Sequence, residues 1–183
     1  KAQLHTFKTQ EGKVLQLTTA QIMELYLLNK REQARGHIYG MGIRVNETTA
    51  KEGKRTVRTR MHSAVKMTEA DVNSIIGTLT VEQKRLADAM GKFLGDNVSA
   101  WGNETSMSMY GYKKFTEENY YPIRTDDNYT ATREKDESNG SLYALKNLGM
   151  TKATQEGAKN PLILGDIIDT ITRHLDEMSS YNG

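Results

Sequence analysis

Aromatic residues are concentrated between Trp101 and Tyr129, and this constrains the fold more than any other feature of the sequence. Seven of the thirteen aromatic residues fall in this segment, which reads WGNETSMSMYGYKKFTEENYYPIRTDDNY and holds the only Trp. Aromatic side chains bury large areas and dominate both protein cores and binding surfaces. We therefore expect the segment to be either an anchor of the fold or a recognition surface.

The first half of the segment continues a predicted helix. Thr80-Val81-Glu82-Gln83 forms a capping box that opens this helix, and Gly111 is its expected end. If Trp101 is buried on the helix, its replacement by Ala should cost about 3–5 kcal/mol. Helical spacing predicts a buried stripe of Leu86, Met90, Phe93, Val98 and Trp101, with Ala87 and Leu94 beside it.

Three glycines, Gly91, Gly95 and Gly102, interrupt the predicted helix. Each weakens an isolated helix by about 1 kcal/mol relative to Ala. We therefore expect a kink or close packing near these glycines, and the sequence leaves both open.

The aromatic residues after Trp101 divide into a buried set and an exposed set. The second half of the segment leads into a polar, turn-rich stretch, residues 124–141, which we expect to be a flexible loop. Tyr121 and Tyr129 lie nearest this loop and are the candidate recognition residues. We expect the others to be mostly buried: Tyr110, Tyr112, Phe115 and Tyr120.

Local patterns elsewhere predict a mainly helical α+β domain over residues 1–183, with four to six helices and a few short strands or hairpins near its N-terminal half. The core is expected to come from helices at 19–35, 80–109 and 162–181. The last helix should begin at Asn160-Pro161, and a short one should follow the capping box at Thr68–Asp71. Two strands are predicted at Leu4–Lys8 and Val14–Leu17, around a turn.

Composition excludes several kinds of chemistry. The chain has no Cys, which rules out thiol catalysis, disulfides and Cys-bound metal centres. None of the four His stands in a metal-ligand spacing, and no phosphate-binding loop or serine nucleophile motif is present. We therefore expect no metal and no cofactor. His174 is interpreted as a partly buried helical His with a hydrogen-bond partner. No apolar run is long enough to span a membrane, so we expect no membrane among the partners.

Residues 44–66 form a basic stretch, although the net charge of the whole chain is only +2. Its cations could neutralise phosphates as a hairpin arm, or they could lie in a solvated loop. Part of the stretch, Arg55–Met61, is expected to pair with Ile43–Val45. The candidate nucleic-acid-binding residues are Lys51, Lys54, Arg55, Arg58 and Arg60.

Three stretches of the sequence resemble a known kind of segment. They are QIMELYLLNKREQARGHIYGMGI at 21–43, LTVEQKRLADAMGKFL with WGNETSMSMYGYKKFTEENYYPI within 79–123, and NPLILGDIIDTITRHLDEMSSY at 160–181. Together they resemble an uncharacterised segment of the large polyvalent proteins of bacterial phages and integrative mobile elements. The resemblance implies a role on an invading element, as a segment delivered with DNA, packaged with it or acting as a connector, and it supplies no catalytic residues.

These observations favour a non-catalytic structural or interaction module. The alternatives are a nucleic-acid-binding module that uses the basic stretch, and an enzyme with a dispersed active site around His174 and Asp166. Because the chain starts at Lys1, we expect it to be excised from a larger protein whose other domains are its partners. The resemblance implies a location in the cytoplasm of a bacterial host or in a virion.

Overall fold

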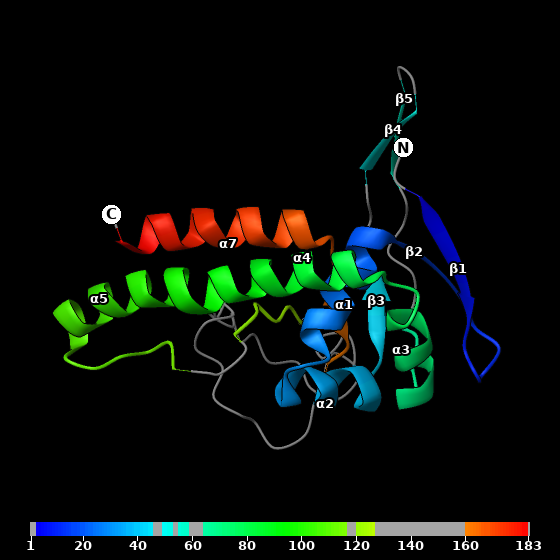
Figure 1. Ribbon diagram of the computed structural model, residues 1–183, viewed down its shortest axis with the longest axis horizontal. Coiled ribbons are helices and arrows are strands. Elements are labelled where there is room, and N and C mark those ends of the chain that lie inside the picture. The colour runs from blue at the N-terminus through cyan, green and yellow to red at the C-terminus, as the bar shows by residue number, and fades with distance from the viewer. Residues whose placement is uncertain are drawn as a thin grey trace, which may run out of the picture.

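The computed structural model describes residues 3–45, 49–52, 55–58, 64–116, 120–126 and 160–182, with only the backbone described at 49–52, 55–58 and 182. The predicted class is confirmed: the fold is α+β and mainly helical. Two long helical rods lie side by side, and the smaller elements gather at one end of them (Figure 1).

The N-terminal hairpin forms as predicted. Strand β1 (Leu4–Lys8) pairs antiparallel with β2 (Val14–Thr18), and Gly12 takes the positive φ of 80° that the turn requires. Leu15 and Leu17 are buried on one face of β2, so the hairpin covers the core with alternate residues.

A short turn at residues 29–31 divides the first predicted helix into two. Helix α1 (Thr19–Leu28) starts at a capping box between Thr18 and Gln21, and α2 (Glu32–Gly40) follows a short turn. The prediction of one helix through Arg35 is therefore wrong. The physical reason is tertiary: buried Arg31, in the turn, donates to the carbonyl oxygen of Tyr121, and Tyr39 donates to the side chain of Asn29 at 2.7 Å.

Strand pairing joins distant parts of the chain. Strand β3 (Ile43–Val45) pairs in parallel with β6 (Leu162–Leu164), so α7 (Ile167–Asn182) begins after β6 and not at Pro161. Strand β5 (Arg55–Arg58) pairs with β4 (Thr49–Glu52) and not with Ile43–Val45. Both expectations are therefore wrong. Residues 43–45 pair with the distant β6, and Ile43 also bridges Val65, while β5 pairs with β4, the strand immediately before it.

Capping boxes start the next two helices, as predicted. Thr68 and Asp71 open α3 (Glu69–Ile76), and Thr80 and Gln83 open α4 (Val81–Lys92). Helix α4 continues through a π-helical turn, η1 (Phe93–Val98), into α5 (Ser99–Tyr110). The rod ends at Gly111 with a φ of 76°, the expected stop.

The rod buries Val98 as predicted, and also Ala87 and Leu94, but it exposes three of the largest side chains of the predicted stripe. The residues that face the core are Ala87, Leu94, Val98 and Gly102. Leu86 is 55% exposed, Phe93 43% and Trp101 41%. Each of these three immediately precedes a buried residue, so the helical period was right and its phase was wrong by one residue. The expectation that Trp101 is buried is corrected accordingly.

Close packing at two glycines explains this phase. A Cβ atom on Gly102 would lie 2.3 Å from Cε of Met178 and 2.6 Å from a ring carbon of Phe115. A Cβ atom on Gly91 would lie 3.1 Å from the side chain of Leu27. Because these two positions carry no side chain, the rod approaches α1 and α7 more closely than it could with large side chains there. Gly95, within η1, has open space beside it.

Some of the aromatic residues after Trp101 lie in the core, and others are exposed. Phe115 and Tyr120 are buried as predicted, but Tyr110 and Tyr112 are exposed, which corrects the expectation for those two. They lie around the end of α5, beyond the last turn that packs on α7. The chain then returns to the rod at Phe115, whose backbone N–H and carbonyl both bond the side chain of Asn103, at 2.9 and 2.8 Å.

Candidate functional site

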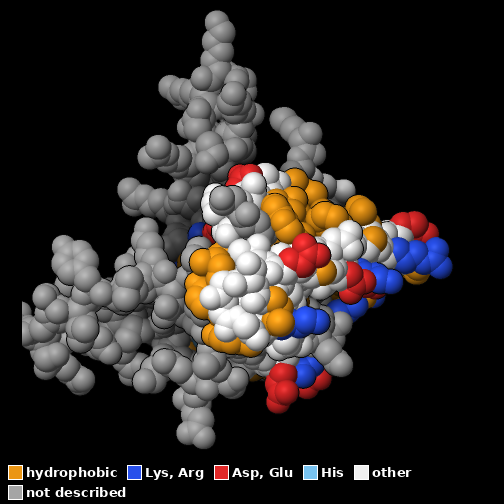
Figure 2. Space-filling model, turned by 90° about the vertical axis from the view of Figure 1, so that its left-hand side faces the viewer, with side chains coloured by type: hydrophobic (Ala, Val, Ile, Leu, Met, Phe, Trp, Pro, Cys, Tyr) orange, Lys and Arg blue, Asp and Glu red, His pale blue; other side chains and the backbone are white. Residues whose placement is uncertain are grey.

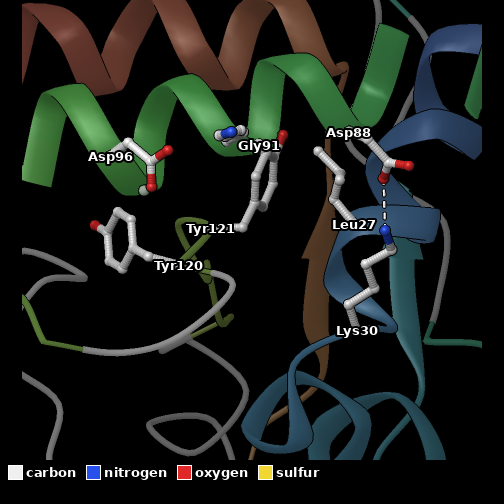
Figure 3. Close-up of a pocket in the computed structure, with 9 residues that line it drawn as sticks. Leu27, Lys30, Asp88, Gly91, Asp96, Tyr120 and Tyr121 are labelled. Carbon is white, nitrogen blue, oxygen red and sulfur yellow. Dashed lines mark hydrogen bonds and ion pairs between the residues drawn. The ribbon is translucent and has the colours of Figure 1, made fainter. Parts of the chain in front are cut away.

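A cleft of about 330 Å³ lies between the end of α1, the rod at α4 and η1, and the segment at Tyr120–Tyr121 (Figure 3). Lys30 Nζ and Asp88 Oδ1 form an ion pair across its mouth at 2.5 Å. The lining contains two Lys and two Asp, so it offers no net charge to a ligand. The lining residues are Leu27, Lys30, Asp88, Gly91, Lys92, Gly95, Asp96, Tyr120 and Tyr121.

Behind the cleft, His174 holds the Tyr120 segment against α7. The hydroxyl of Tyr120 and Nε2 of His174 are 3.3 Å apart, and the Arg31 guanidinium lies 5.5 Å from the centre of the Tyr120 ring. Burial, assisted by Arg173, lowers the pKa of His174 from 6.5 to about 4. Burial also raises the pKa of Tyr120 to about 12. Both groups are neutral near pH 7, and the interpretation of His174 as a buried, hydrogen-bonded helical residue is confirmed.

A second polar cluster is enclosed in the core, where α1 meets α7. Thr170 donates to Oε1 of Glu24 at 2.8 Å. Oε2 of Glu24 and the hydroxyl of Tyr121 are both buried, and neither has a hydrogen-bond partner among the described residues. Burial raises the pKa of Glu24 from 4.5 to about 7 and raises that of Tyr121 as well. Tyr121 also lines the cleft, whereas Glu24 and Thr170 do not, so the carboxyl of Glu24 lies behind the cleft and not in its lining.

Sequence reasoning missed Glu24, although a signal was present. Glu24 stands within the apolar run Ile22-Met23-Glu24-Leu25 of the most apolar predicted helix. A charged residue surrounded by apolar ones on every side of a helix is forced toward the interior. This pattern could have identified Glu24 as a buried carboxyl.

The predicted recognition tyrosines differ in their placement. Tyr121 is only 1% exposed, so its ring is part of the core and is not free to contact a partner. Its position before Pro122 brings the chain inward, next to Arg31 and Glu24. Tyr129 lies outside the described residues, as do residues 127–141 of the expected loop.

The predicted nucleic-acid-binding residues lie on or beside the β4–β5 hairpin. Lys51 belongs to β4, and Arg55 and Arg58 belong to β5, which pairs antiparallel with it. Lys54 and Arg60 are outside the described residues. Arg44, the first cation of the basic stretch, forms an ion pair with Asp126 in the body of the fold.

Large exposed apolar side chains define a surface on the rod. We call Leu86, Phe93 and Trp101 the outer apolar face, because they line one side of α4, η1 and α5 at helical spacing. Met90 lies between them and is partly buried. Figure 2 shows hydrophobic side chains gathered in patches on the side of the molecule where α5 and α7 end.

Neither the structure nor comparison with known proteins supplies a catalytic template. Within the described ranges, no three His, Asp or Glu side chains are placed to hold a metal ion. No helix in the described part of the chain is long and apolar enough to cross a membrane. No family model matches the sequence, and neither a curated protein nor a solved structure matches it significantly.

Proposed function

We propose that this chain is a non-catalytic interaction module that binds a protein partner through the outer apolar face. One observation carries the proposal. Of the eleven large hydrophobic side chains that the described residues expose, eight lie between Val81 and Tyr112, on the rod and the turn that ends it. Surface hydrophobic residues scattered singly need no explanation, but a cluster of them marks an interaction site.

The composition of this cluster supports the same function. On the outer apolar face it includes Phe93 and Trp101, and at the end of α5 it includes Met109 and Tyr110, all of residue types that interfaces use more than other surfaces do. The small residues of the rod face the core instead, as the close contacts at Gly102 show. The large side chains are therefore left for a contact outside the chain.

A displayed peptide library tests this function. Phage carrying random helical peptides are selected on the wild-type chain, and each recovered clone is tested on the Leu86→Ser/Phe93→Ser variant. The matched control is Leu4→Ser/Val14→Ser, which removes two equally exposed apolar residues from the N-terminal hairpin. We expect most clones to lose binding to the first variant and to keep it with the second. Recovery of clones that bind both variants equally would reject the outer apolar face as the binding surface.

The resemblance to segments of large polyvalent proteins supports a setting for this module. We infer that it acts within a phage or mobile-element protein, in the host cytoplasm or in a virion, and that its partners include other domains of that protein. The full-length reading frame tests this setting, since it would show which domains flank the module.

Nucleic-acid binding is a second candidate function, favoured by the position of the basic hairpin. Strands β4 and β5, which contain Lys51, Arg55 and Arg58, extend away from the helices (Figure 1). Phosphate contacts from such an arm should weaken steeply as salt rises. The electrophoretic mobility of DNA and RNA, measured with and without the protein at low salt, tests this function. Unchanged mobility would reject nucleic-acid binding.

An enzyme built around His174 and Asp166 is the weakest of the three functions. His174 is buried and paired with Tyr120, while Asp166 accepts the N–H of Ile168 at the start of α7, at 2.8 Å. Neither residue lines the described cleft. A turnover screen for hydrolase, nuclease and transferase activity tests this reading, and an activity lost on one polar substitution would overturn the non-catalytic proposal.

A further inference from the structure

We propose that Glu24 and residues 120–124, which we call the latch segment, form a pH-sensitive latch: ionisation of Glu24 releases the segment and opens one wall of the cleft. Three elements meet at this latch, α1 through Glu24, α7 through Thr170 and the latch segment through Tyr121. The latch is separate from the outer apolar face, so it does not depend on the proposed interaction function.

The Glu24 carboxyl is enclosed and only half satisfied. Its Oε1 accepts from Thr170 at 2.8 Å, while Oε2 is buried and has no hydrogen-bond partner among the described residues. The backbone packs closely at Gly165, where a Cβ atom would lie 3.3 Å from Oε2 and 3.3 Å from Oγ1 of Thr170. A buried carboxylate needs a counter-ion or several donors, whereas a neutral acid needs fewer partners. The site therefore suits the protonated form.

The charged groups around Glu24 do not compensate its ionised form. Burial is the main reason that the pKa of Glu24 is raised from 4.5 to about 7. Asp166 of α7 raises it further, while Arg173 of α7 and Arg124 of the latch segment partly offset this. None of these three described residues forms an ion pair with Glu24. A carboxylate formed here is therefore stabilised by any movement that lets water reach it.

Of the three elements, the latch segment is the easiest to displace. Residues 120–124 form neither a helix nor a strand, whereas Glu24 and Thr170 lie within helices. Irregular segments that few contacts hold open at a lower free energy than packed helices do. Besides the burial of its side chains, the latch segment is held by individual hydrogen bonds: Arg31 to the carbonyl of Tyr121, Tyr120 with His174, and Ile163 to the carbonyl of Arg124.

Tyr121 connects the buried carboxyl to the cleft. Its side chain points from the latch segment toward the rod and lines the cleft (Figure 3). Burial, and then the Glu24 carboxyl, raise the pKa of Tyr121, so its hydroxyl lies within electrostatic reach of Glu24. Displacement of Tyr121 would join the cleft to the space around Glu24, and the Glu24 proton would pass to solvent. The open form should therefore become more populated as pH rises from 4.5 to 7, and then level off.

Hydrogen exchange at two backbone amides measures this opening. Ile163 N–H donates to the carbonyl of Arg124 at 2.8 Å, and Asp126 N–H donates to the carbonyl of Pro161 at 3.0 Å. Both bonds break when the latch segment leaves. The protection factors of these amides, corrected for the intrinsic exchange rate, are measured by NMR for the wild type and Glu24→Gln at pH 5.5 and pH 8.5.

We expect the protection factor of Glu24→Gln, divided by that of the wild type, to rise about thirtyfold from pH 5.5 to pH 8.5. This factor follows from a Glu24 pKa of about 7 in the closed form and 4.5 once water reaches the carboxyl. His174 titrates in both proteins, so its effect cancels in the ratio. Low urea should change the protection little, because a local opening exposes little surface.

Two further variants control the measurement. Asp96→Asn removes an exposed carboxylate from the lining of the same cleft, and its protection should follow that of the wild type at every pH. Thr170→Val keeps Glu24 but removes the hydrogen bond that lowers its pKa, so protection should be lost at higher pH than in the wild type. This variant tests the latch even if Glu24→Gln does not fold.

Two outcomes would overturn the latch. A ratio that stays constant from pH 5.5 to pH 8.5 would show that Glu24 does not control the segment. A thirtyfold change that also appears at the amides of the rod, and that grows with urea, would assign the effect to global unfolding and not to a local opening.

Discussion

The buried carboxyl of Glu24 predicts an unusual dependence of stability on pH. Its pKa is about 7 in the folded chain, against 4.5 ordinarily, because burial between α1 and α7 disfavours the charged form. The stability that the neutral carboxyl contributes is therefore complete below pH 4.5 and is lost as pH rises through 7. A difference of about 2.5 pKa units corresponds to a loss of about 3 kcal/mol.

His174 has the opposite effect over an overlapping range. Burial lowers its pKa from 6.5 to about 4. The stability that the neutral imidazole contributes is therefore complete above pH 6.5 and is lost as pH falls through 4. Between about pH 4.5 and 6.5 the two slopes cancel, and the wild-type free energy of unfolding should be nearly flat. Above pH 6.5 only the Glu24 loss continues.

Glu24→Gln separates the two groups. The amide stays neutral at every pH, and its oxygen can still accept the Thr170 hydrogen bond. Urea unfolding followed by far-UV circular dichroism, at intervals from pH 4 to 8.5, measures the difference between variant and wild type. We expect this difference to shift by about 3 kcal/mol in favour of Glu24→Gln across the range. Parallel profiles for the two proteins would refute the assignment of Glu24 as a buried neutral acid.

Three further predictions concern packing and titration. Gly102→Ala should cost about 1–3 kcal/mol in urea unfolding, because its Cβ would meet Met178 at 2.3 Å, while Gly95→Ala, with open space beside it, should not destabilise. Trp101→Ala should cost about 1–2 kcal/mol, below the 3–5 expected for a buried Trp, and a larger loss would place the ring in the core. His174→Gln should replace the flat range between about pH 4.5 and 6.5 with a free energy of unfolding that rises as pH falls, because only the Glu24 slope remains, and a range that stays flat would show that His174 is not the responsible group.

Local signals in the sequence predicted the ends of the elements well. The capping boxes at Thr68 and Thr80 and the glycine stop at Gly111 all depend on residues within a few positions of one another. The N-terminal hairpin is equally local. These features follow from hydrogen bonds that the segment makes with itself, so no knowledge of the tertiary structure is needed.

Features that depend on distant partners could not be predicted in the same way. The parallel pairing of β3 with β6 joins residues more than a hundred positions apart. The phase of the rod depends on Met178 and Phe115 approaching Gly102, whereas side-chain size alone favoured the larger residues one position earlier, Leu86, Phe93 and Trp101. The same error placed Trp101 inside, so the outer apolar face became visible only once the packing was known.

The most direct test of the interaction module is to measure folding and binding on the same variant. Leu86→Ser/Phe93→Ser truncates two side chains that are about half exposed, so the free energy of unfolding should fall by only about 1–2 kcal/mol. Its affinity for peptides selected on the wild type should fall at least tenfold. A loss of about 5 kcal/mol or more with binding retained would contradict the account, because the face would then serve the core and not a partner.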